Sequence, residues 1–351
     1  MSSLRGARGF AGGRWGHAEG MDDVADCPKR MVFGPCGGVQ DDGGCELADH
    51  RCVFLDRPLV PWPGAPVAGV PLPMRDDGGP VVLTDLSVTP FDPDSVRRVV
   101  AVLAPVSDGL LVGEHANRPD FPPTMFAAEV IDAGGRPWTT LACRDRNRVV
   151  LEQELAGLAA VGVDAVLCVT GDGRGASVRP GVTQVFDLDG PRLAALAAAA
   201  GLPVAVPESP EAPPVGLRPA RVAEKQRAGA SVCVLNHVSG PARVAAFVEA
   251  ARAAGATVPF VAGVAVYTDE PSARVLQRFP GLHLDGAVVE RVLAAPDPRA
   301  AGIAVAVAEA RALLAVPGVV GVNLSGTGSG GGVDDGARIK AEIAGQVREA
   351  A

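Results

Sequence analysis

From Val81 onward the chain alternates short apolar runs with longer Ala-rich amphipathic stretches. Apolar runs of roughly four to eight residues between turn residues are typical of buried parallel strands, and the stretches between them are typical of helices. The runs that predict strands are Val81–Leu86, Gly109–Val112, Thr139–Ala142, Ala165–Val169, Pro203–Val206, Val232–Leu235, Val258–Val266 and Gly318–Asn323. The clearest predicted helices are Asn147–Val161, Ala242–Ala254 and Arg299–Ala315.

The order of these elements predicts the fold class. Repeated alternation of strand and helix predicts a parallel sheet, and eight such repeats can close into a barrel. We therefore expect an α/β protein whose residues 79–351 form a (β/α)8 TIM barrel. An open, doubly wound sheet is the alternative, although no Gly-x-Gly-x-x-Gly fingerprint follows the first predicted strand.

The part that precedes the barrel lacks this periodicity and divides into three segments. Residues 1–22 are rich in Gly and Arg and lack the apolar stretch of a signal peptide, so they are predicted to be a disordered tail. Residues 23–57 form a compact segment rich in Cys and Gly. Residues 58–78 are rich in Pro, which favours an extended, semi-rigid connector.

Four cysteines in the second segment predict a metal site. Cys27, Cys36, Cys45 and Cys52 follow the spacing C-x8-C-x8-C-x6-C. Four thiolates can hold a tetrahedral zinc ion or a 4Fe–4S cluster, and so short a segment needs a staple to fold. Two disulfides or four free thiols are the alternatives, and His50 is a candidate substitute ligand.

Composition narrows the function classes. The chain has 351 residues, of which 48% are hydrophobic and 21% charged, with a net charge of -8. An acidic protein gains nothing from a phosphate backbone, so nucleic acid is not an expected partner. No apolar run reaches the roughly eighteen residues that a membrane span requires, and a cytoplasmic location is the default expectation.

Polar residues gather where the predicted strands end, which is where catalytic residues lie in barrels of this class. Asp172, in VTGDGRG, could stabilise a cation or accept hydrogen bonds from an amidine-like ring edge, and an Asp-Gly turn is the alternative. Asn236 can both donate and accept, so it could bind the edge of a heterocycle, whereas His237 is interpreted as structural.

Two further motifs have a structural and a functional interpretation. In CRDRNR, Asp145 could cap the helix that begins near Asn147, or the arginines could form a basic rim that holds an acidic group. The Gly-rich stretch Asn323–Gly332 could be a phosphate-binding loop or a flexible linker.

Taken together, these segments resemble a known family. LACRDRNR, an amphipathic helix and GVDAVLCVTGD resemble the central signature of the methylenetetrahydrofolate reductases, and EKQRAGASVCVLNH follows in the family's order. This resemblance covers residues 81–347. Separately, CPKRMVFGPCGGV with Cys45 and Cys52 resembles the cysteine domain of the MetV partner subunit, or of C-terminal extensions in some reductases.

The resemblance implies an oxidoreductase of one-carbon folate metabolism. The family reduces 5,10-methylenetetrahydrofolate to 5-methyltetrahydrofolate by hydride transfer from FAD, which a nicotinamide, NAD(P)H, reduces in turn. Asp85 stands where the family has the glutamate that assists ring opening, and Asp172 matches the aspartate that stabilises the resulting cation. Both are predicted to be catalytic.

The remaining implied residues fall into two groups. The predicted substrate-binding residues are Asn236, Glu114, Asn117, Arg144, Tyr267 and Asn323, and the predicted cofactor-binding residues are Thr140, Thr170, Gly171 and Lys225. Thr140 and Thr170 stand where many members have a His and an Arg that hold FAD, so the resemblance implies the folate more strongly than FAD. The alternative functions are a folate-dependent methyl or one-carbon transferase and a folate-binding component that needs a redox partner chain. The oligomeric state is left open, and it includes a homo-oligomer.

Overall fold

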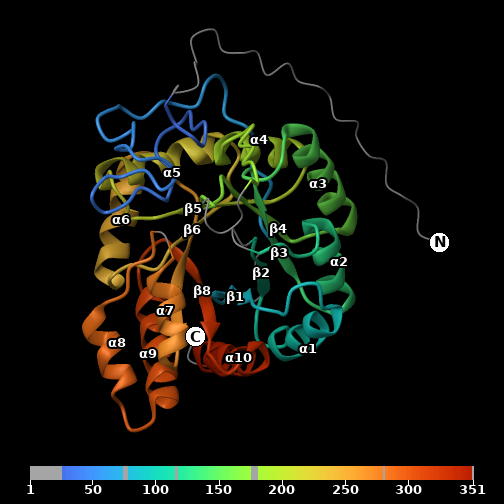
Figure 1. Ribbon diagram of the computed structural model, residues 1–351, viewed down its shortest axis with the longest axis vertical. Helices are drawn as coiled ribbons and strands as arrows, with labels where there is room; N and C mark the ends of the chain where they lie inside the picture. Colours follow the sequence, from blue (N-terminus) through green and yellow to red (C-terminus); the bar gives the residue numbers. More distant parts are fainter. Residues whose placement is uncertain (1–25, 74–77, 115–117, 175–180, 280, 350–351) are drawn as a thin grey trace, which may run out of the picture.

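The computed structural model describes residues 26–73, 78–114, 118–174, 181–279 and 281–349. Eight parallel strands pair in sequence order and close into a barrel that is surrounded by helices (Figure 1). The pairing of β1 (Val81–Leu86) with both β2 (Gly109–Val112) and β8 (Val319–Gly328) confirms the predicted (β/α)8 class and rules out an open sheet. The predicted tail and Asn117 lie outside the described residues.

The apolar runs locate the strands closely. The other strands are β3 (Pro137–Ala142), β4 (Ala165–Val169), β5 (Val204–Glu208), β6 (Val232–Leu235) and β7 (Phe260–Tyr267). The prediction that Asn323–Gly332 is a loop is wrong for its first part, because β8 continues to Gly328 and pairs with β7 as far as Tyr267.

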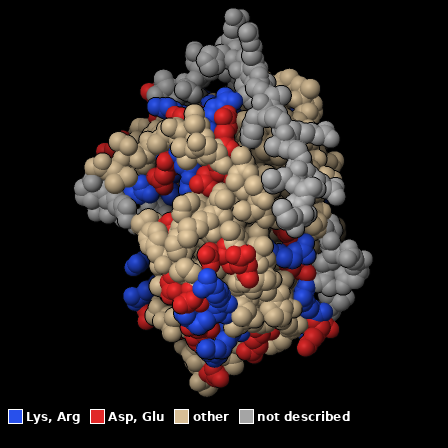
Figure 2. Space-filling view, turned by 90° about the vertical axis from the view of Figure 1, so that its right-hand side faces the viewer, with Lys and Arg blue, Asp and Glu red and all other residues tan. Residues whose placement is uncertain are grey.

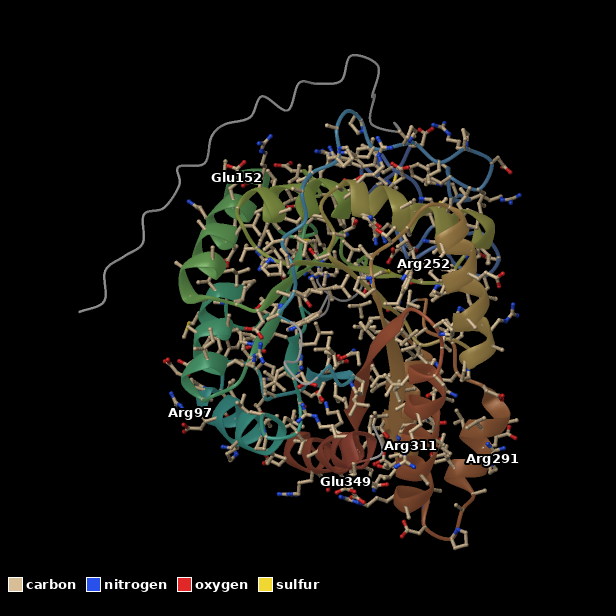
Figure 3. All side chains as sticks on the ribbon, turned by 180° about the vertical axis from the view of Figure 1, so that it is seen from behind. Arg97, Glu152, Arg252, Arg291, Arg311 and Glu349 are labelled. Carbon is tan, nitrogen blue, oxygen red and sulfur yellow. The ribbon has the colours of Figure 1, made fainter. Side chains whose placement is uncertain are left out.

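Helices alternate with the strands and form the outer layer of the barrel. They are α1 (Pro93–Leu103), α2 (Pro123–Asp132), α3 (Arg148–Val161), α4 (Gly190–Ala199), the 3-10 turn η1 (Val215–Leu217), α5 (Arg218–Arg227), α6 (Pro241–Ala253), α7 (Glu270–Gln277), α8 (Gly286–Leu293), α9 (Pro298–Leu314) and α10 (Val333–Glu349). Charged residues of this ring, such as Arg97, Glu152 and Glu349, lie at the periphery (Figure 3).

Local sequence explains where α3 begins. The side chain of Asn147 accepts a hydrogen bond from the Val150 amide at 3.0 Å and so satisfies one of the unpaired amides of the first turn. Capping by Asp145, one of the two interpretations of CRDRNR, is not what the structure has. Its carboxylate instead pairs with Arg174 and Arg144.

Two apolar layers hold the barrel together. One lies between strands and helices and includes Leu155, Val204 and Phe260. The other fills the interior, where Leu83 and Trp138 are almost fully buried.

On the outer surface, acidic and basic side chains lie beside one another in mixed clusters on the face that Figure 2 presents. None of the helices in the described ranges is both long and apolar enough to cross a bilayer.

Residues 26–57, called here the cysteine segment, lie against the barrel near α4 and α5 (Figure 1). Val32, Phe33 and Trp62 pack against Ala195 of α4 and Ala228, which follows α5. The connector then runs along the barrel wall, where the Val67 amide bonds to the Arg227 oxygen and Ser231 bonds to the Val70 oxygen.

The connector ends at the base of the barrel. Leu72 packs against the interior apolar cluster that contains Val81, the first residue of β1. The chain therefore passes from the mouth of the barrel, along its outside, to its base before the first strand begins.

Candidate functional site

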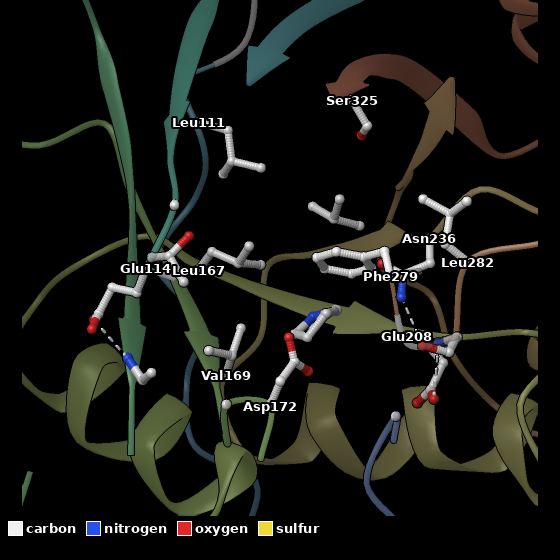
Figure 4. A pocket seen from close by; sticks show the side chains of 18 of the residues that line it. Leu111, Glu114, Leu167, Val169, Asp172, Glu208, Asn236, Phe279, Leu282 and Ser325 are labelled. Carbon is white, nitrogen blue, oxygen red and sulfur yellow. Dashed lines mark hydrogen bonds between the residues drawn. The ribbon is translucent and has the colours of Figure 1, made fainter. Parts of the chain in front are cut away.

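A cavity of about 370 Å³ opens at the carboxyl ends of the strands. Apolar side chains form two of its sides, with Leu111, Leu167 and Val169 on one and Phe279 and Leu282 on the other (Figure 4). Asp85, Glu114, Asp172, Asn236 and Asn323 add polar groups to the lining. A mostly apolar cavity with a few convergent polar groups is typical of a site for an organic ligand.

Asp85 lies at the end of β1 and lines the cavity, as predicted. Its Oδ1 atom accepts a hydrogen bond from Asn323 at 2.9 Å, and its Oδ2 atom accepts one from the Gly326 amide at 3.1 Å. Both oxygens thus act as acceptors, which suits an ionised carboxylate rather than a proton donor.

Asp172 follows β4 and also lines the cavity. Burial raises the pKa of this carboxyl, while Lys29 and Arg144 act in the opposite direction and Glu46 raises it further. The main-chain oxygen of Asp172 accepts a hydrogen bond from Arg144 at 3.3 Å. A carboxylate held among apolar walls interacts strongly with any positive charge that develops beside it.

Glu114 follows β2 and lies on the same side of the cavity as Leu167 and Val169 (Figure 4). It accepts hydrogen bonds from the Ala142 amide at 2.9 Å and from Arg146 at 2.6 Å. Burial raises the pKa of Glu114 even though Arg146 opposes this. The ion pair between Glu114 and Arg146 links the ends of β2 and β3. Both carboxylate oxygens of Glu114 therefore already accept hydrogen bonds from the protein.

Two amide side chains face the cavity from β6 and β8. Asn236 donates to Ser209 at 2.8 Å. Asn323 donates to Asp85, and its Oδ1 atom is buried without a hydrogen-bond partner among the described residues. A buried carbonyl without a donor is costly, so this oxygen is available to a donor group of a ligand.

A buried charge cluster lies at the end of β5, where Glu208, Arg221 and Lys225 line the cavity. Glu208 pairs with Lys225 at 2.9 Å and with Arg218 at 3.2 Å, and Arg221 lies 3.8 Å from it. The three cations share one face of α5 because they are three and seven residues apart. Burial alone would raise the pKa of Glu208, but Lys225, Arg221 and Arg218 together lower it to about 2.

The predicted cofactor-binding residues lie together, and the cysteine segment contacts them. Thr140, Thr170, Gly171 and Lys225 all line the cavity. The Thr170 hydroxyl contacts the Met31 sulfur at 3.4 Å, and the Gly171 oxygen accepts a hydrogen bond from Lys29 at 2.6 Å. Side chains of the cysteine segment therefore occupy part of the region in which the sequence predicts a bound cofactor.

Two predicted substrate residues do not reach the cavity lining. Arg144 is 2% exposed and lies beneath the β4–α4 loop, bonded to Asp145 and to the Asp172 oxygen. Tyr267, at the end of β7, packs in an apolar cluster with Leu276 and Val292. Neither placement fits direct ligand binding.

Sequence reasoning missed the contribution of the cysteine segment. Lys29, Met31, Cys36 and Gly37 all line the same cavity as the strand ends. Nothing in their local pattern indicates a contact with a barrel whose strands begin only at Val81. Phe279 and Leu282 were missed as well, because they follow α7 rather than a strand.

His237 fits the structural interpretation. Its ring bonds to the His283 oxygen at 2.6 Å and to Glu309 at 2.8 Å. Burial by itself lowers the pKa of His237, but the hydrogen bond and the charge of Glu309, together with the His283 oxygen and Glu211, outweigh it, so the pKa is raised. The side chain thus ties the end of β6 to α9.

The four cysteines of the segment line one small cavity, together with His50. All four are free and half-buried. Burial raises the pKa of Cys36 to about 11, so a metal ion would have to displace its proton. Across the described residues, no group of three or more His, Cys, Asp or Glu is arranged to hold a metal ion, so zinc and an iron–sulfur cluster remain predictions.

Comparison with known proteins adds two findings. Residues 17–57 match the family described as Methylene-tetrahydrofolate reductase C terminal, which confirms the resemblance predicted for the cysteine segment. No curated protein matches the chain. Together with the closed barrel, the family match fits a methylenetetrahydrofolate reductase-like architecture.

A solved structure shares the barrel fold. It is that of an uncharacterized protein from Clostridium thermocellum, described as binding two copies of 5-methyl-5,6,7,8-tetrahydrofolic acid. The TM-score is 0.59 at 12% sequence identity, and the similarity covers 78% of this chain and 96% of that chain. At this identity the similarity is one of fold.

Proposed function

We propose that the chain binds a reduced folate at the barrel mouth and interconverts 5,10-methylene- and 5-methyltetrahydrofolate by hydride transfer. The observation that carries the proposal is Asp172, a half-buried carboxylate in a mostly apolar cavity between the barrel and a segment that matches a reductase family. The folate described for the barrel neighbour supports the choice of ligand.

The cavity lining suits the parts of such a ligand. Asp172 can accept hydrogen bonds from the amidine-like edge of a pterin, and Asn236 can both donate and accept. The unpartnered oxygen of Asn323 can accept one more. Phe279 and Leu282 oppose Leu167 and Val169, so a flat ring can lie between two apolar walls (Figure 4).

Hydride addition to a folate passes through an iminium cation, and the charge of Asp172 would stabilise that cation. We propose direct transfer from a nicotinamide rather than from FAD. Met31 and Lys29 contact Thr170 and Gly171, which stand where a flavin would be expected from the resemblance. Lys225, another of the cofactor-side candidates, donates a hydrogen bond to Glu208.

Methyl transfer is the second candidate, and Asp85 is the observation that favours it. Both carboxylate oxygens of Asp85 accept hydrogen bonds, so this residue is poorly suited to protonate the opening ring. Transfer of a methyl group that is already formed requires no ring opening. The same cavity would then hold 5-methyltetrahydrofolate and present its methyl group to an acceptor.

The test combines binding with turnover. Titration calorimetry with 5-methyltetrahydrofolate measures occupancy, and absorbance at the nicotinamide band measures hydride transfer with methylenetetrahydrofolate and NADH or NADPH. Binding together with nicotinamide oxidation supports the reductase. Binding with loss of the methyl group and no nicotinamide dependence supports the transferase, and no binding contradicts both.

The proposed organisation follows the same division as the sequence. Residues 23–57 would form the cysteine-rich part, 58–78 the connector and 79–351 the catalytic barrel. Zinc or a 4Fe–4S cluster would be held by Cys27, Cys36, Cys45 and Cys52, which share one cavity. Such a group would supply structural cross-linking or electron transfer when bound.

A further inference from the structure

We propose that Lys29 and Glu46 act as a clamp through which the cysteine segment holds the β4–α4 loop (residues 170–174) and positions Asp172 toward the ligand. This inference goes beyond the proposed function and depends on it only for the identity of the ligand. It makes the cysteine segment part of the binding site rather than an appended module.

The cysteine segment makes hydrogen bonds to the residues on both sides of Asp172. Lys29 donates to the Gly171 oxygen at 2.6 Å, and the Gly173 amide donates to Glu46 at 2.8 Å. The main chain is therefore held on both sides of Asp172 by side chains of the cysteine segment. Lys29 and Glu46 also pair with each other, which links the two attachments.

Glu46 and Leu47 fit closely against two glycines, Gly38 and Gly173. A Cβ atom at Gly38 would lie 1.8 Å from the Glu46 carboxylate, and a Cβ atom at Gly173 would lie 2.3 Å from Leu47 and 3.2 Å from Glu46. Real Cβ atoms do not approach other atoms so closely. A larger side chain at Gly38 would therefore displace the Glu46 carboxylate, and one at Gly173 would displace Leu47, which packs at the contact between segment and loop.

Lys29 brings a positive charge close to two carboxylates. Lys29 is 3% exposed, and its ammonium group interacts with both Glu46 and Asp172. It also lies 5.9 Å from the centre of the Phe186 ring. Without this cation, the carboxylates of Glu46 and Asp172 would repel each other in a poorly solvated place. Lys29 is thus a positioning residue, since it acts on the ligand through Asp172.

Two readouts test the clamp in the full-length protein. The first is amide hydrogen exchange in peptides that cover residues 165–174. Loss of a hydrogen bond to a charged group is expected to raise exchange there by about tenfold or more in Lys29→Met and in Glu46→Ala. Arg30→Met is the matched control, because Arg30 is the next residue and its side chain is exposed. Lys29→Arg should restore most of the protection.

The second readout is a double-mutant cycle on turnover. If Lys29 acts through Asp172, then Lys29→Met combined with Asp172→Asn should be little slower than Asp172→Asn alone. Full additivity would overturn the proposal, as would wild-type exchange in both clamp variants. Circular dichroism identifies a variant that fails to fold, in which case Glu46→Ala supplies the test.

The two readouts separate this inference from the proposed function. If the wild-type protein neither binds nor converts folates, the proposed function fails, and the exchange measurement still decides whether the clamp exists. If folate turnover is present and both clamp variants behave as the wild type, the inference alone fails.

Discussion

The Nζ atom of Lys340 donates a hydrogen bond of 2.5 Å to the main-chain oxygen of Asp85, which joins α10 to the end of β1. A second bond of 3.1 Å reaches the Gly326 oxygen in β8. Lys340 is 1% exposed. These two hydrogen bonds join α10 to the place where β1 pairs with β8 and closes the barrel. A cation at this place has a direct consequence for stability.

Stability is expected to depend on pH through Lys340. Burial lowers the pKa of Lys340 from 10.5 to about 8, although Asp85 opposes this. Between these values the unfolded chain binds more protons than the folded one, so the free energy of unfolding should rise as the pH increases from about 8 to 10.5. The shift corresponds to about 3 kcal/mol.

Urea unfolding of wild type and Lys340→Met across this pH window isolates the effect. The variant lacks the titrating group, so the wild type should gain stability relative to it as the pH rises. A difference between the two proteins that does not change with pH would contradict the shifted pKa. Lys340→Met also removes both carbonyl contacts, and a lower stability at every pH is expected in addition.

Asp172→Asn should reduce turnover far more than affinity. The carboxylate would stabilise charge that develops in the transition state, whereas the amide keeps the size of the side chain. We expect kcat to fall by about 100-fold or more, with the Kd of 5-methyltetrahydrofolate changed only a few-fold. Asp164→Asn, at the opposite end of β4, is the control. Wild-type turnover in Asp172→Asn would remove Asp172 from the mechanism.

Glu208→Gln should destabilise the barrel strongly. The substitution leaves Lys225, Arg218 and Arg221 buried without their shared counter-charge, which typically costs about 3–5 kcal/mol. Denaturant unfolding measures the loss. Glu152→Gln, which removes only an exposed ion pair with Arg148, should change stability by less than about 1 kcal/mol. Equal effects of the two substitutions would refute the role given to the buried cluster.

The difference in the free energy of unfolding between wild type and Glu208→Gln should depend on pH. The carboxyl has a pKa of about 2 in the folded protein, below its ordinary value of 4.5. Its contribution is therefore fully present above 4.5 and is lost as the pH falls toward 2. Unfolding at several acidic pH values should show the two proteins converging.

Cys36→Ser should lower the metal content of the purified protein if the four cysteines hold a metal. A metal that binds the folded segment also stabilises it, so the temperature at which this segment unfolds should fall. Elemental analysis provides the measurement. Cys143→Ala, which changes a buried thiol of the barrel core, is the control and should keep its metal. Unchanged metal content in Cys36→Ser would exclude the four-thiolate site.

The strands could be predicted from the sequence because each is a buried apolar run between turns. Val81–Leu86 and Val232–Leu235 coincide residue for residue with the observed β1 and β6. Since the ends of the strands carry the site, Asp85, Glu114, Asp172 and Asn236 were placed at the cavity by the same argument.

The remaining site features depend on contacts that no local pattern records. Tyr267 ends a strand as predicted, but the β7–β8 register shifts between Ala265 and Tyr267, and its ring packs with α7 and α8. Lys29 is far from the barrel in sequence and reaches the cavity only because the connector returns along α5. The register of two paired strands and the docking of a segment far away in sequence are both set by tertiary contacts, so the local sequence does not predict them.

The path of the connector also sets an order of events during synthesis. The cysteine segment is translated before the barrel, but Gly171, Asp189 and Arg218, to which it bonds, follow much later in the chain. Contacts of such wide sequence separation form slowly, because a long loop must close first. Although it leaves the ribosome before the barrel does, the cysteine segment should therefore be among the last parts to reach its final place, after β4, β5 and α5 have formed.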